Sequence, residues 1–165
     1  MRASSVRVSH LLLALSAVPL VAGGVRLAQM ATGALDASMV RFHQAPWPVA
    51  LHILAAALFS TLGAFQLDPR WRAKAPRWHR QAGAVALVSG LVVAATGGYM
   101  AVTYAIPESL QGPLLRVTRF AVSGGMLVSL LLALRAIVQR RFDAHGAWML
   151  RAYALGLGAG TQVLV

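Results

Sequence analysis

The sequence has no cysteine and very few acidic residues. Its 165 residues include four Asp and Glu against fifteen Lys and Arg, which gives a formal net charge of +11. The absence of cysteine excludes disulfides, thiolate nucleophiles and iron–sulfur or thiolate zinc sites. Only 12% of the residues are charged and 58% are hydrophobic, whereas a globular domain carries roughly 25% charged residues. Such a chain exposes too much apolar surface for water, and a lipid bilayer is its natural solvent.

All four carboxylates lie outside the apolar runs of the sequence, at Asp36, Asp68, Glu108 and Asp143. Proton-coupled pumps and cation transporters generally carry an acid at membrane depth. Paired carboxylates for hydrolysis and a glycine-rich phosphate loop are also missing. These absences disfavour solute transport, glycoside-type hydrolysis and nucleotide chemistry.

Five apolar segments are long enough to cross a bilayer, which takes about 20 residues for roughly 30 Å of hydrocarbon. They cover residues 10–30, 47–67, 83–105, 115–138 and 148–165. The connections between them are short and leave no room for a soluble domain. We therefore predict an all-α fold, a polytopic transmembrane helical bundle of about five spans that forms one membrane domain over residues 1–165.

Lys and Arg concentrate in alternate connections of the predicted bundle. The stretch before the first span, the loop 68–82 and the loop 139–147 are basic, whereas the two other loops hold one Arg and no Lys. Cytoplasmic loops are enriched in Lys and Arg, so we place the N-terminus inside and expect a multi-pass protein of the bacterial inner membrane. The cations of loop 68–82 favour anionic lipid headgroups as partners, at about 1 kcal/mol per cation, and not nucleic acid.

Both ends of the chain leave an alternative open. Arg2 and Arg7 before an apolar run are also typical of a signal peptide, whose cleavage would leave four helices in the same orientation. At Val165 the sequence stops within an apolar run, which indicates a truncated sequence or a short member of a family.

Histidines are the main candidates for chemistry, because neutral imidazole is a common ligand of haem iron and metals. His79 and His145 each precede a predicted helix on the inner side. If the third and fifth segments are neighbours, the two rings can meet and hold a b-type haem or a metal. His52 lies within the second span, on the face of its small residues, so we expect it to point into the bundle and line a cofactor or quinone site. His43 lies in the preceding loop.

Each histidine also has a structural reading. The imidazoles of His79 and His145 can cap a helix or bind lipid headgroups, and His52 can hydrogen-bond to a Ser, Thr or carbonyl of a neighbouring helix. Two arginines near span ends, Arg119 and Arg151, are predicted to bind an anionic or carbonyl group of the same cofactor. The alternative for both is that the side chain extends to the membrane surface.

Four strings resemble a family of predicted membrane proteins, domain of unknown function 2306. They are LHI at 51–53, GAFQ at 63–66, RWHRQAG at 77–83 and HGAWMLRAYA at 145–154. The resemblance implies a polytopic bacterial inner-membrane protein, often one helix longer than this chain. It implies no activity.

The function predicted from these observations is electron transfer linked to a b-type haem or a quinone, at a site formed by the three histidines and two arginines. The alternative is a non-catalytic scaffold or assembly subunit that binds other membrane proteins through its small-residue helix faces.

Overall fold

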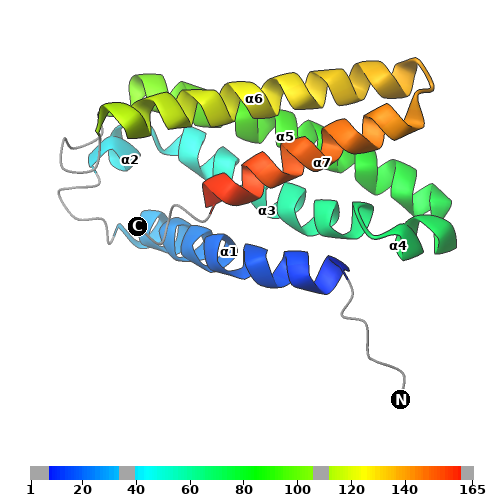
Figure 1. Ribbon diagram of the computed structural model, residues 1–165. Coiled ribbons are helices and arrows are strands. Elements are labelled where there is room, and N and C mark those ends of the chain that lie inside the picture. The colour runs from blue at the N-terminus through cyan, green and yellow to red at the C-terminus, as the bar shows by residue number, and fades with distance from the viewer. Residues whose placement is uncertain (1–7, 34–39, 106–111, 161–165) are drawn as a thin grey trace.

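The protein is all-helical in the computed structural model, which describes residues 8–33, 40–105 and 112–160. This part of the chain contains no strand (Figure 1). Its helices are α1 (Val8–Thr32), α2 (Val40–Gln44), α3 (Pro46–Gln66), α4 (Pro69–Lys74), α5 (Pro76–Thr103), α6 (Pro113–Val138) and α7 (Phe142–Gly160). Four of them, α1, α3, α5 and α6, are long and apolar enough to span a membrane. The predicted all-α membrane fold is confirmed.

Two helices begin earlier than the sequence pattern suggested. Helix α5 starts at Pro76 and not near residue 83, so that His79 lies in its first turns and not in a loop. Helix α7 starts at Phe142 and not at residue 148. Asp143, His145 and Arg151 lie within α7 and lower its hydropathy, which explains why it is not among the four apolar spanning helices. Residues 161–165 of the fifth predicted span lie outside the described residues.

Proline marks the start of four helices, α3 to α6. Proline is suited to the first helical position. Its φ is already helical, and the N–H that it lacks would have no partner within the helix at this position. It occupies the beginning of α3, α4, α5 and α6, at Pro46, Pro69, Pro76 and Pro113. Between α6 and α7 the chain reverses through Arg140, whose φ is +58°.

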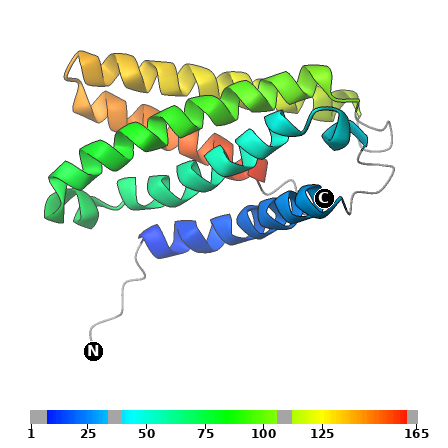
Figure 2. The same cartoon turned by 180° about the vertical axis from the view of Figure 1, so that it is seen from behind.

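The helices pack as two hairpins with α1 on one side. Helices α3 and α5 lie against each other, α6 packs on both α5 and α7, and α1 contacts α3 and the far end of α7. Figures 1 and 2 show α6 and α1 on opposite sides of the α3–α5 pair. We call the end formed by α4, the first turns of α5 and the α6–α7 connection the basic end. The opposite end carries α2 and the start of α3.

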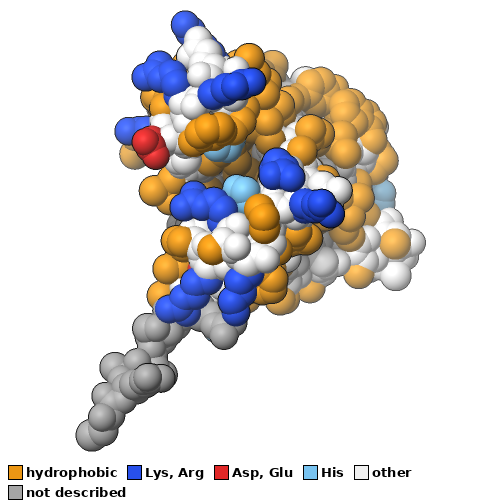
Figure 3. Space-filling model, turned by 90° about the vertical axis from the view of Figure 1, so that its right-hand side faces the viewer, with side chains coloured by type: hydrophobic (Ala, Val, Ile, Leu, Met, Phe, Trp, Pro, Cys, Tyr) orange, Lys and Arg blue, Asp and Glu red, His pale blue; other side chains and the backbone are white. Residues whose placement is uncertain are grey.

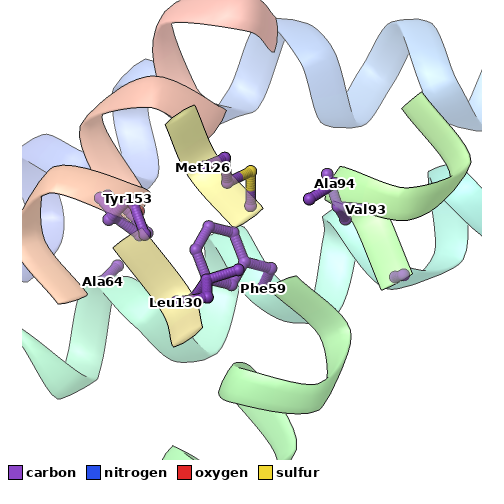
Figure 4. Packing of buried hydrophobic residues seen from close by; sticks show 9 residues of the cluster. Phe59, Ala64, Val93, Ala94, Met126, Leu130 and Tyr153 are labelled. Carbon is purple, nitrogen blue, oxygen red and sulfur yellow. The ribbon is translucent and has the colours of Figure 1, made fainter. Parts of the chain in front are cut away.

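Phe59 is the centre of the buried core. Its side chain is 3% exposed and packs with Met126 and Leu130 of α6 and with Tyr153 of α7, whose ring centroid lies 5.7 Å away (Figure 4). A Cβ built at Gly90 of α5 would lie 2.8 Å from the Phe59 ring. Small residues let membrane helices approach closely, so glycine at this position permits the contact between α3 and α5.

Candidate functional site

His52 of α3 is fixed by a hydrogen bond to Thr96 of α5, with 2.9 Å between Nδ1 and the Thr96 hydroxyl oxygen. Thr96 donates its own proton to the Val92 carbonyl at 2.6 Å, so its oxygen accepts from the imidazole. We therefore assign the proton of neutral His52 to Nδ1. In this tautomer Nε2 is a hydrogen-bond acceptor.

His52 lines a cavity of about 340 Å³ between the helices. The size lies within the range of ligand-binding cavities, about 300–1,000 Å³. Side chains of α1, α3, α5, α6 and α7 form its wall, and most of them are apolar. Four polar side chains also line it: Arg26, His52, Ser60 and Ser123. A mostly apolar cavity with a few polar groups is the usual form of a small-molecule site.

The absence of a side chain at Gly97 lets His52 and Ser123 approach each other. A Cβ built on this residue would lie 3.2 Å from the Ser123 hydroxyl oxygen and 3.4 Å from Cε1 of His52. The serine of α6 and the histidine of α3 therefore meet over the same glycine of α5. Arg119 lies one helical turn before Ser123 and so on the same face of α6. Its Nη1 atom is buried and has no hydrogen-bond partner within the described residues.

At the basic end, His79 and His145 lie close enough to interact electrostatically. His145 donates its Nδ1 proton to the Ala133 carbonyl of α6 at 2.9 Å. In the described structure, Nδ1 of His79 is buried without a partner. An orphaned buried N–H is rarer than an orphaned acceptor, so we assign the proton of His79 to Nε2.

The five predicted site residues do not form one site. Thr96, the partner of His52, follows His79 by 17 residues on α5, which corresponds to about 25 Å at 1.5 Å per residue. Arg119 belongs to the cavity half of the bundle. Arg151 is exposed, and its guanidinium carbon lies 4.5 Å from the Trp148 ring centroid. The structure thus separates a His52 cavity from a pair of histidines at the basic end.

The histidine pair fits a bis-histidine haem at one ligand only. A ligating histidine binds the metal through one nitrogen and donates the other N–H to a protein group. His145 meets this requirement through its bond to Ala133. His79 does not, because a ring that binds iron through Nε2 carries its proton on Nδ1, which is buried without a partner in the described structure. Among the described residues no group of three His, Asp or Glu side chains is arranged to hold a metal ion either.

Thr96 and Ser123 were missed by the sequence analysis. A threonine or serine within an apolar span commonly bonds to the carbonyl of its own helix, and Thr96 does so at Val92. The sequence alternative in which His52 bonds to a Ser, Thr or carbonyl of a neighbouring helix is confirmed by this bond. Nothing in the sequence indicates that the partner is Thr96, 44 positions away. His43 lies exposed on α2 and takes no part in the cavity.

Comparison with protein families identifies the chain. The model of the predicted membrane protein family DUF2306 matches residues 49–165. The chain belongs to the DUF2306 family. The match begins in α3 and includes His52, Thr96, Ser123 and both histidines of the basic end. Searches of curated proteins and of solved structures found no match, so the assignment of function to this DUF2306 protein rests on its own residues.

Proposed function

We propose that this DUF2306 protein binds a membrane-soluble quinone or quinol in the His52 cavity and acts as a quinone-linked electron-transfer component. The observation that carries the proposal is the His52 ring, which lines a mostly apolar cavity between helices and whose Nδ1 bond to Thr96 leaves Nε2 as the acceptor nitrogen. A quinol has the matching chemistry, because its ring is apolar and either of its two opposed hydroxyls can donate to that nitrogen.

The polar groups of the cavity suit both redox forms of such a ligand. A quinol hydroxyl donates to Nε2 of His52, and a quinone carbonyl accepts from the Ser123 hydroxyl. Oxidation of a quinol releases two protons and two electrons. Nε2 of His52 can accept one proton as it leaves a quinol hydroxyl, and the second proton passes to water at the membrane surface. The two electrons leave to a separate redox partner, since the histidine pair at the basic end meets the requirements of a haem at only one ligand.

The test is a calorimetric titration of the purified full chain in lipid nanodiscs with a short-chain quinol that is kept reduced. We expect saturable binding, weakened about two- to tenfold in His52→Ala because one hydrogen bond contributes roughly 0.5–1.5 kcal/mol. The matched control is His43→Ala, which removes an exposed imidazole outside the cavity.

Absence of saturable binding, or equal affinity of wild type and His52→Ala, would overturn the proposal. Recovery of a stoichiometric membrane-protein partner together with no quinone binding would favour the scaffold function instead. Thermal unfolding of wild type and His52→Ala in the same nanodiscs separates loss of a ligand hydrogen bond from loss of folding, because only a misfolded variant loses its unfolding transition.

A further inference from the structure

The basic end concentrates cations around two histidines. Figure 3 looks onto this end and shows Lys and Arg side chains surrounding histidine atoms. The cations come from α4, the first turns of α5 and the α6–α7 connection: Arg70, Arg72, Lys74, Arg77, Arg80, Arg140 and Arg141. Positive residues at a membrane surface attract anionic headgroups in general, so the question is whether this end holds a specific site.

His79 is the focus of this charge. Arg80 follows it in α5, Arg72 lies on α4, which packs against α5, and His145 lies on α7, which also contacts α5. All three are near enough to act on His79 electrostatically, and none of them is a carboxylate. Two carboxylates lie in the same part of the described structure. Asp68 accepts from the Ser9 hydroxyl and the Arg70 backbone N–H, and Asp143 is exposed in the first turn of α7. The cations around His79 favour a bound anion, and neither of these two carboxylates supplies it.

Three aromatic residues adjacent in sequence to these cations, or close to them, form a cluster. The rings of Trp71 and Trp78 are 5.7 Å apart, and the Phe65 ring contacts both at 5.3 and 6.0 Å. Trp71 directly precedes Arg72, and Trp78 directly precedes His79. Tryptophan prefers the depth of the lipid headgroups, so the cluster indicates that the neighbouring cations lie at the level of lipid phosphates.

We propose that the basic end binds one phosphate group, of a lipid headgroup or free in solution, through Arg72, Arg80 and His79. The planar guanidinium groups are suited to bind phosphate oxygens in pairs. The assigned Nε2 proton of His79 gives a third donor. His145 stays bound to the Ala133 carbonyl and borders the site. This site is separate from the His52 cavity, and either proposal can fail without the other.

The experiment measures lipid binding to the purified full chain in neutral detergent by native mass spectrometry. Phosphatidylglycerol is compared with phosphatidylcholine for the wild type, Arg72→Gln, Arg80→Gln and Lys74→Gln. Lys74→Gln is the matched control, because it removes the same charge from the same helix as Arg72→Gln but Lys74 is not among the groups acting on His79.

We expect Arg72→Gln and Arg80→Gln each to weaken phosphatidylglycerol binding about fivefold, His79→Ala to weaken it as well, and Lys74→Gln to change it much less. Equal losses in all charge variants would overturn the proposal in favour of a diffuse basic surface. No loss in any variant would also overturn it.

Competition with inorganic phosphate identifies the source of the phosphate group. Displacement of the bound lipid by millimolar phosphate, lost in Arg72→Gln, supports a site that a free phosphate can fill. Lipid that phosphate does not displace, with the same ranking of variants, supports a site for the headgroup of a membrane lipid.

Discussion

Ser9, in the first turn of α1, donates its hydroxyl proton to the Asp68 carboxylate at 2.9 Å, across 59 positions of sequence. Asp68 also accepts from the Arg70 backbone N–H at 3.0 Å and thereby caps α4. Both side chains are buried, at 1% and 3% exposure. Helix α1 buries only 6% of its most apolar window in the bundle, so this bond is one of the few polar contacts that hold its start in place.

Acid should weaken the attachment of α1. The Arg70 backbone N–H, followed by the Ser9 hydroxyl, holds the pKa of Asp68 below its ordinary value of 3.8. A carboxyl with a lowered pKa in the folded state stabilises the protein above the ordinary pKa, and this stability is lost as the pH falls through the lower folded value. We expect hydrogen exchange of α1 to increase below pH 3.8.

Asp68→Ala should remove this acid response and increase exchange of α1 already at neutral pH. The control is Asp143→Ala, which removes an exposed carboxyl from the same end of the molecule. An unchanged acid response in Asp68→Ala would show that another group controls it.

Thr96→Val tests the bond that positions His52. Valine has nearly the same shape but cannot accept the Nδ1 proton, and interhelical hydrogen bonds in membranes contribute about 0.6 kcal/mol and at most about 1.7 kcal/mol. We expect a loss of stability of this size in detergent unfolding, together with weaker quinone binding. Thr103→Val is the matched control, because the exposed Thr103 hydroxyl donates only to Tyr99 of its own helix, at 2.9 Å.

Gly97→Ala should reduce quinone affinity, because the new methyl group would press on Ser123 and on the His52 ring at 3.2 and 3.4 Å. The neighbouring Gly98→Ala is an internal control, since its methyl group would meet only Ser123 Cβ, at an ordinary 3.8 Å. Calorimetry of the two variants under identical conditions gives the comparison. Equal affinities in the two variants would place the ligand away from the Gly97 surface.

The sequence predicted the fold better than the site. Apolar length was sufficient to predict the all-α membrane bundle, because a segment spans lipid only if it is long and apolar enough and its backbone groups are all hydrogen-bonded. The same pattern placed His79 in a loop, since its flanking cations interrupt the apolar run, whereas Pro76 starts the helix earlier. Polar partners such as Thr96 depend on which helices are neighbours and at what height, and spacing along one chain does not contain that information.

The haem hypothesis has a direct spectroscopic test. Since the basic-end pair meets the ligand requirements at His145 alone, we expect protein purified from haem-replete cells to show no Soret or α band of a bis-histidine haem in a reduced-minus-oxidised spectrum. Bands that disappear in both His79→Ala and His145→Ala would contradict this expectation and the phosphate site together, because His79 would then donate a lone pair to iron.

Arg119 and Arg151 were both predicted to bind the cofactor, but substitutions at the two positions should affect quinone affinity differently. Arg119 lies on the face of α6 that carries Ser123, and its Nη1 atom is buried without a partner in the described structure. Arg151 is exposed and stacks on Trp148 at 4.5 Å, which suits a side chain that extends toward the lipid headgroups. Arg119 does not itself line the cavity, but its long side chain starts one helical turn from Ser123 and can reach a ligand oxygen there. We therefore expect Arg119→Gln to lower quinone affinity several-fold and Arg151→Gln to leave it unchanged. Calorimetry in nanodiscs measures both, and a loss of affinity in Arg151→Gln equal to that in Arg119→Gln would indicate a general effect of charge and not a contact at the cavity.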